Sequence, residues 1–175
     1  MQQLELEKTY LAKYLPHDLL DSPHKEIVDI YIPVNREHPK LRIRKNGDKY
    51  EITKKIKLDQ NDASQQTEDT ISMDIEEYTA LASIPGKKVE KIRCYYKFHG
   101  KTAEIDVFKG ELSGLVLVDF EFDSIEGLKQ FSLPNFCLVD VTQEDFVAGG
   151  KLCGRKYKDI EQDLKRFNYS KLTIA

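Results

Sequence analysis

Like-charged residues occur as pairs two positions apart in five segments of this sequence, and apolar residues dominate the positions between and beside them. Because successive side chains of a β-strand point to opposite faces, each pair would lie on one face of a strand and the apolar residues on the other. Three segments carry acidic pairs and two carry basic pairs. The pairs are Glu5 and Glu7, Glu104 and Asp106, Asp119 and Glu121, Arg42 and Arg44, and Lys91 and Arg93.

This sorting of charges by sign allows two arrangements of the strands. In the first, an antiparallel sheet turns its charged face to water and helices cover the other face. That arrangement favours mixed signs along each strand, since neighbouring like charges are unfavourable. In the second, the sheet curls so that the charged faces surround a ligand and the helices pack outside. Such an interior requires opposing charges and a bound polyanion with its metals, because an unpaired buried ion is costly. The pattern alone does not decide between them.

Composition narrows the functional classes. A chain of 175 residues is expected to form one domain, residues 1–175, with a sizeable core. Its net charge of -3 lacks the basic excess that general nucleic-acid binding requires. The longest strongly apolar run, residues 115–118, is too short to cross a membrane, and the N-terminal segment does not resemble a signal peptide. Three unpaired cysteines are typical of reduced thiols in a cytoplasmic protein.

Alternation of apolar and polar residues predicts a chain rich in strands. Asn46-Gly47-Asp48 is the strongest hairpin signal, and the polar stretch 59–67 is predicted to be a loop. The predicted strands are 4–11, 26–32, 41–45, 49–56, 68–73, 89–98, 102–108, 115–122 and 138–142.

Three helices are predicted from capping residues and apolar spacing. The first spans 74–83, where Ser72 or Asp74 can cap the start and Pro85-Gly86 follows the end. Its apolar face would comprise Ile75, Tyr78, Leu81 and Ala82. Ser124 is expected to cap a short helix over 125–131. An amphipathic helix over 155–167 would bury the stripe Tyr157, Ile160, Leu164 and Phe167.

Six pieces of the sequence, in order, resemble the CYTH family, the triphosphate tunnel metalloenzymes. They are E-x-E at residues 5–7, LRIR at 41–44, K-x-R in VEKIRCY, EIDVF at 104–108, LVDFEF at 117–122 and DVT at 140–142. The resemblance implies an α+β protein built on a closed antiparallel β-barrel of about eight strands, with a charged lumen and helices packed outside. It therefore supports the inward-facing arrangement of the charged pairs.

The resemblance also implies roles for individual residues. Glu5, Glu7 and Lys91 would take part in catalysis. A group of acidic residues would bind Mg²⁺ or Mn²⁺, which prefer oxygen ligands. A group of basic residues would bind a triphosphate. The implied metal set is Glu5, Glu7, Glu104, Asp106, Asp119 and Glu121, and the implied phosphate set is Arg42, Arg44, Lys55, Lys91 and Arg93.

The chain departs from the family pattern at three places. The family signature is E-x-E-x-K, whereas Thr9 stands on the face of Glu5 and Glu7 here, and Lys8 points the other way unless the strand bulges. A second E-x-E, present in many relatives, is matched by Glu68 followed by Thr70. Near the end of the chain, only Lys151 and Leu152 match the family segment that carries a lysine.

Inorganic triphosphate hydrolysis is the activity that the small architecture most resembles. An adenylate cyclase or a thiamine triphosphatase is the alternative among enzymes, and a non-catalytic polyphosphate-binding module is the alternative outside them. The expected partner is a small triphosphate or inorganic polyphosphate, with no nucleic acid and no membrane. The expected assembly is a monomer or a homodimer.

Overall fold

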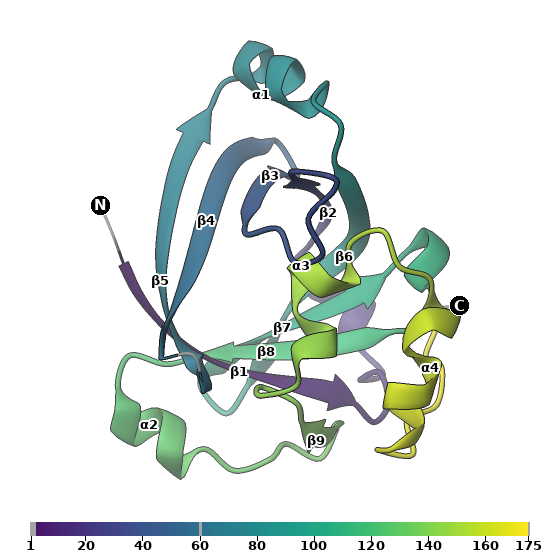
Figure 1. Ribbon diagram of the computed structural model, residues 1–175. Helices are drawn as coiled ribbons and strands as arrows, with labels where there is room; N and C mark the ends of the chain where they lie inside the picture. Colours follow the sequence, from purple (N-terminus) through teal and green to yellow (C-terminus); the bar gives the residue numbers. More distant parts are fainter. Residues whose placement is uncertain (1–2, 60, 175) are drawn as a thin grey trace.

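A computed structural model describes residues 3–59 and 61–174, and its centre is a closed antiparallel β-barrel (Figure 1). The hydrogen-bonded order is β5-β4-β3-β2-β6-β7-β8-β1, and pairing of β1 with β5 closes the ring. The predicted fold class is confirmed. The barrel strands are β1 (Gln3–Ala12), β2 (His24–Ile32), β3 (Leu41–Asn46), β4 (Lys49–Asp59), β5 (Asp62–Met73), β6 (Lys87–Phe98), β7 (Lys101–Phe108) and β8 (Val116–Glu121).

Tight turns set the register of two hairpins. Gly47 begins the loop between β3 and β4 with φ of 60°, and Asn46 pairs with Lys49 across it. His99 and Gly100 join β6 to β7 with φ of 46° and 78°, the left-handed conformations that a two-residue hairpin loop uses. Both turns lie where the sequence predicted them, so the charged pairs of neighbouring strands face the same side.

The barrel has a seam along β1. The first half of β1 pairs with β5 through Gln3–Leu6, and its last part pairs on the same edge with β9 (Cys137–Asp140). Gln143 joins the two sides of this seam, because its amide accepts from the Ala63 N–H at 2.9 Å and donates to Asp62 at 3.0 Å. Strand β9 ends two residues before the predicted boundary at Thr142.

The prediction of a loop over residues 59–67 was wrong. Strand β4 extends to Asp59 and β5 already begins at Asp62, while residue 60 lies outside the described residues. Asp62 stabilises the turn by accepting hydrogen bonds from the backbone and side chain of Ser64 at 2.9 and 2.7 Å. The segment is polar because its inner face borders a charged interior, and polarity was therefore a poor guide to loop structure.

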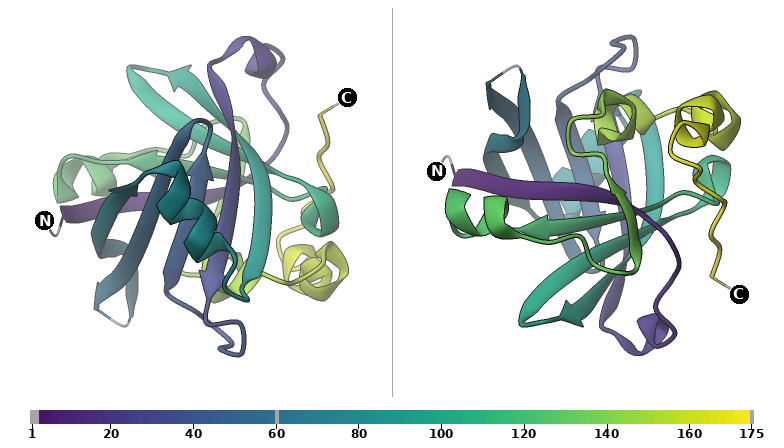
Figure 2. Two further views of the ribbon diagram at one scale, coloured as in Figure 1. Left: turned by 90° about the horizontal axis from the view of Figure 1, so that it is seen from above. Right: turned by 90° about the horizontal axis from the view of Figure 1, so that it is seen from below.

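The four helices lie outside the barrel, as Figure 2 shows from two sides. Asp74 caps α1 in a capping box with Glu77, and Ser124 caps α2. Helix α1 crosses the outer side of β3 and β4, yet none of its residues is fully buried and Ile75 is 53% exposed. The helices are α1 (Ile75–Ala82), α2 (Ile125–Gln130), α3 (Gly149–Leu152) and α4 (Tyr157–Lys165).

Apolar packing closes one end of the barrel. On β1, β7 and β8 the inward-facing rows change from charged to apolar at Leu11, Phe108 and Leu117, which join one buried cluster with α3 and α4. Helix α3 can approach this end because Gly149 has no side chain; a Cβ there would lie 2.1 Å from Oη of Tyr31. The barrel interior is consequently lined by charged side chains along part of its length and closed at one end by packed apolar side chains.

Three further observations concern the described part of the chain. The predicted stripe of α4 packs inward through Tyr157, Ile160 and Leu164. All three cysteines are free thiols and buried. None of the described helices combines the length and hydrophobicity needed to span a membrane.

Candidate active site

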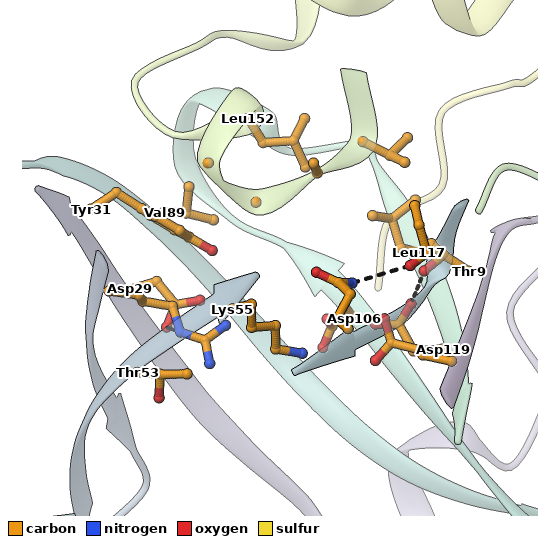
Figure 3. A pocket seen from close by; sticks show the side chains of 18 of the residues that line it. Thr9, Asp29, Tyr31, Thr53, Lys55, Val89, Asp106, Leu117, Asp119 and Leu152 are labelled. Carbon is orange, nitrogen blue, oxygen red and sulfur yellow. Dashed lines mark hydrogen bonds and ion pairs between the residues drawn. The ribbon is translucent and has the colours of Figure 1, made fainter. Parts of the chain in front are cut away.

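The barrel encloses a cavity of about 290 Å³, and Figure 3 shows Lys55, Asp106 and Asp119 among the side chains that line it. Of the residues predicted for the site, only Glu104 is absent from its lining, and Glu104 forms an ion pair with Arg93 beside it. Lys55 rather than Lys54 faces inward, as the family resemblance suggested. The predicted residues that line the cavity are Glu5, Glu7, Arg42, Arg44, Lys55, Lys91, Arg93, Asp106, Asp119 and Glu121.

Asp29 organises the basic side of the cavity, and sequence reasoning missed it. It pairs with Arg44 across β2 and β3, and Arg44 donates to both of its oxygens at 2.7 and 2.8 Å. Burial raises the pKa of Asp29, which is only 2% exposed, but the charges of Arg44 and Arg42 outweigh burial and hold that pKa below its usual range. A lone aspartate among the apolar residues of β2, opposite a predicted arginine, was the available signal.

Arg42 differs from Arg44 because it retains a free donor. Its Nε lies 3.8 Å from Asp29 Oδ1, too far for a hydrogen bond, and has no other partner within the part of the chain that the structure describes. The side chain is only 12% exposed. A buried guanidinium N–H without an acceptor is unfavourable, and an oxyanion in the cavity would satisfy it.

Arg93 contacts three carboxylates of the cavity wall. It donates from Nε and Nη2 to Asp106 at 2.7 Å each, forms an ion pair with Glu104, and lies 3.5 Å from Asp119. Lys91 also donates to Asp106. Burial raises the pKa of Asp106, but Arg93 and Lys91 outweigh it and hold the value at about 2. Burial lowers the pKa of Lys91, and the charge of Asp106 opposes that change.

Glu5, Glu7 and Glu121 form an acidic corner next to these ion pairs. One oxygen from each carboxylate lies within 4.8 Å of the others. Burial raises the pKa of Glu121, and the negative charges of Glu7 and Glu5 raise it further. Lys55 partly compensates the corner, with Nζ 2.6 Å from Glu5 and 3.2 Å from Glu68. Three convergent carboxylates match the oxygen ligands of a hard divalent cation, so these residues fit a metal.

The structure settles the register at Thr9. Strand β1 pairs regularly with β8 from Glu7 to Leu11, so Thr9 shares the inner face and donates from Oγ1 to Asp119 at 2.7 Å. Lys8 points outside the cavity, 4.0 Å from Asp140. At the second departure from the family pattern, Thr70 donates to Glu68 at 2.7 Å.

Comparison with known proteins identifies the family. The chain is 30% identical over 142 residues to the inorganic triphosphatase of Nitrosomonas europaea, an alignment that covers 80% of this chain and 90% of that protein. The chain belongs to the CYTH family of triphosphate tunnel metalloenzymes. No family model matches the sequence of this CYTH protein.

Solved structures agree with the family assignment. The crystal structure of the inorganic triphosphatase NE1496 superposes with a TM-score of 0.62 and 26% identity, over 85% of this chain and 93% of that one. A conserved hypothetical protein from Pyrococcus furiosus superposes with a TM-score of 0.52 and 27% identity, over 71% of this chain and 83% of that one. The three proteins therefore share one fold.

Proposed function

We propose that this CYTH protein hydrolyses inorganic triphosphate with the help of Mg²⁺ or Mn²⁺. The observation that carries the proposal is the coexistence, in one cavity of about 290 Å³, of an unsatisfied arginine donor and a three-carboxylate corner. The first feature suits a phosphate oxygen and the second suits a divalent cation. The similarity to an inorganic triphosphatase supports the choice of substrate.

The basic side chains would bind and orient the phosphate chain. Arg42 would donate to a phosphate oxygen. Arg44 would present a positive charge to the phosphate chain from a fixed position, because its guanidinium is hydrogen-bonded to Asp29 on the neighbouring strand. Lys55, Lys91 and Arg93 would neutralise the remaining oxygens. Phosphoryl transfer depends mainly on positioning and on charge neutralisation, so no nucleophilic serine or cysteine is required.

Glu5, Glu7 and Glu121 would hold the cation. When bound there, it supplies Lewis-acid stabilisation of the charge on the transferring phosphoryl group. Glu104, Asp106 and Asp119 belong to the same proposed metal set, but in this structure they contact Arg93. These three carboxylates would have to bind a metal while still paired with Arg93. Glu5, Glu7 and Glu121 are therefore the stronger candidates for the metal ligands.

A phosphate-release assay tests the proposal. Purified protein is incubated with tripolyphosphate, pyrophosphate, ATP or thiamine triphosphate, with Mg²⁺, Mn²⁺ or excess chelator. We expect the highest turnover with tripolyphosphate and none in chelator. Cyclic AMP formed from ATP would favour a cyclase instead, and tight binding of tripolyphosphate without turnover would favour a non-catalytic polyphosphate-binding module.

A further inference from the structure

A second group of basic residues lines the same cavity beyond the phosphate set. On β4 the inward row continues from Thr53 and Lys55 to Lys57, one strand step of about 6–7 Å past Lys55. Lys40 and His38, from the segment before β3, line the cavity as well. We refer to His38, Lys40 and Lys57 as the basic mouth. None of its residues belongs to the set implied by the family motifs.

The basic mouth is poorly neutralised. Lys57 lies 3.6 Å from Asp145, whose side chain is 68% exposed, and this contact is weak at such exposure. Lys40 forms no ion pair with any residue of the described chain. The other nearby carboxylate, Glu144, accepts a hydrogen bond from Arg166 at 2.5 Å. Positive charge is therefore in excess here, in contrast to Arg44 and Arg93, which each hold a carboxylate.

The pKa values agree with this excess. Burial lowers the pKa of His38 to about 4, and the charges of Lys40 and Lys151 lower it further. Burial likewise lowers the pKa of Lys40, and the charge of Lys57 adds to that effect. A bound polyanion would relieve the repulsion among these groups.

Building on the proposed function, we propose that the basic mouth binds the additional phosphates of a linear inorganic polyphosphate, so that chains of four or more phosphates bind more tightly than tripolyphosphate. Lys40 and Lys57 extend the cationic lining beyond Arg42 and Lys55, which matches a ligand whose negative charge repeats along its length. A nucleoside would instead need an aromatic or apolar face for its base. The aromatic and larger apolar residues of the lining, such as Tyr31, Phe108 and Leu152, are buried in the cluster that closes the barrel and present no open face to a base.

The test compares chain lengths in two double variants. Lys40→Met with Lys57→Met removes both ammonium groups of the basic mouth. Lys45→Met with Lys54→Met is the matched control, since these exposed lysines lie on β3 and β4 outside the cavity. Steady-state kinetics with Mg²⁺ and calorimetric binding in chelator are measured for tripolyphosphate, tetrapolyphosphate and ATP, and melting curves verify that each variant is folded.

We expect wild-type protein to bind tetrapolyphosphate more tightly than tripolyphosphate. The mouth variant should lose about tenfold in affinity for tetrapolyphosphate and less than about twofold for tripolyphosphate, the range for two partly exposed charges. The control should keep both affinities. Equal losses for the two chains, no loss, or a larger loss for ATP would overturn the inference. Wild type that turns over no substrate would contradict the proposed function, and the calorimetry would still test the mouth.

Discussion

Asp29 and Glu121 are carboxylates of one cavity whose surroundings shift their pKa values in opposite directions. Asp29 is deeply buried, but the bidentate guanidinium of Arg44 keeps it ionised. Glu121 is far more exposed, yet burial and the neighbouring charges of Glu7 and Glu5 favour its protonated form. Burial alone therefore does not decide the direction of these pKa shifts, because neighbouring charges oppose burial at Asp29 and add to it at Glu121.

The comparison separates two kinds of region in the barrel. Asp29 with Arg44, and Asp106 with Arg93 and Lys91, form ion pairs within the protein, so these carboxylates are compensated without a ligand. In the acidic corner, three carboxylates converge, and Lys55 is the cation that forms an ion pair with one of them among the described residues. Compensated ion pairs support folding, whereas three converging carboxylates suit the binding of a cation.

The largest predicted effect tests the compensated region. Asp29→Asn keeps the shape of the side chain but leaves Arg44 buried without a counter-charge, so it should lower the free energy of unfolding by about 3–5 kcal/mol. Urea denaturation measures the change. Asp69→Asn, on the outer face of β5, is the control and should have little effect. A loss below about 1 kcal/mol would mean that the region does not depend on this pair.

The pH dependence of this effect has a definite sign. Because the folded pKa of Asp29 lies below its unfolded value of about 3.9, its contribution is fully present above that value. It is lost as the pH falls toward the folded pKa, where the carboxylate is protonated. The stability difference between wild type and Asp29→Asn should therefore shrink as the pH is lowered below about 4.

The next prediction tests the acidic corner through activity. Glu7→Gln removes one anionic ligand without changing size and should lower the maximal rate on tripolyphosphate by about 100-fold. Glu126→Gln, on the exposed side of α2, should keep the wild-type rate. Excess chelator should abolish the wild-type reaction and added Mg²⁺ should restore it. Full activity in chelator would disprove the assignment of a metal to the corner.

A third prediction uses the free donor of Arg42. Tripolyphosphate with Mg²⁺ at about 100 times its dissociation constant should stabilise wild type by about 2.7 kcal/mol. Arg42→Gln should lose most of the accompanying rise in melting temperature and keep nearly the same stability without ligand, because Arg42 forms no close ion pair. Arg93→Gln should instead have a much lower melting temperature without ligand, because Asp106 and Glu104 would lose their shared cation and repel each other. If both variants had the same ligand-free melting temperature and the same rise with ligand, the distinction between a ligand-binding Arg42 and a structural Arg93 would be wrong.

Much of this comparison was accessible from the sequence. Alternation along each strand gave its charged and apolar faces, and the family resemblance turned the charged faces inward and favoured Lys55 over Lys54. These features are local, because a strand's period of two and a hairpin turn depend on neighbouring residues. The family resemblance added closure of the sheet, which composition and periodicity could not supply.

What the sequence did not give depends on contacts between distant residues. Asp29 looked like one polar residue in an apolar strand until β3 placed Arg44 opposite it. The segment 62–67 looked like a loop because its polar residues border the lumen instead of an apolar core. The convergence of Glu5 and Glu7 with Glu121 needs β1 and β8 side by side. Pairing between strands, which is absent from local pattern, decides all three.

A fourth prediction concerns the position where the family signature has a lysine. Thr9→Lys would add an ammonium beside Asp119 and should raise the maximal rate by about tenfold, or roughly 1.4 kcal/mol of barrier. Lys8→Ala should change the rate little, because Lys8 lies outside the cavity near Asp140. Steady-state rates of the two single variants decide the matter. A collapse in Lys8→Ala, with no gain in Thr9→Lys, would show that Lys8 acts inside the barrel during turnover.

The smallest predicted effect concerns the stability of the acidic corner itself. Glu121→Gln removes one of three converging charges, so the ligand-free variant should melt slightly higher than wild type at pH 7. Screening at this exposed site limits the gain to a fraction of about 1 kcal/mol, or about 1–2 °C for a chain of this size. Differential scanning calorimetry in chelator measures the change, with Glu126→Gln as the control.

This last effect should vanish at low pH and reverse with metal. The pKa of Glu121 is higher in the folded state than in the unfolded chain, so the carboxyl favours folding at low pH and opposes it as the pH rises through the folded value. The advantage of Glu121→Gln should therefore disappear near pH 4. Added Mg²⁺ should stabilise wild type more than the variant, because wild type keeps all three carboxylates. A variant that melts lower than wild type in chelator at pH 7 would show that the three carboxylates do not repel one another.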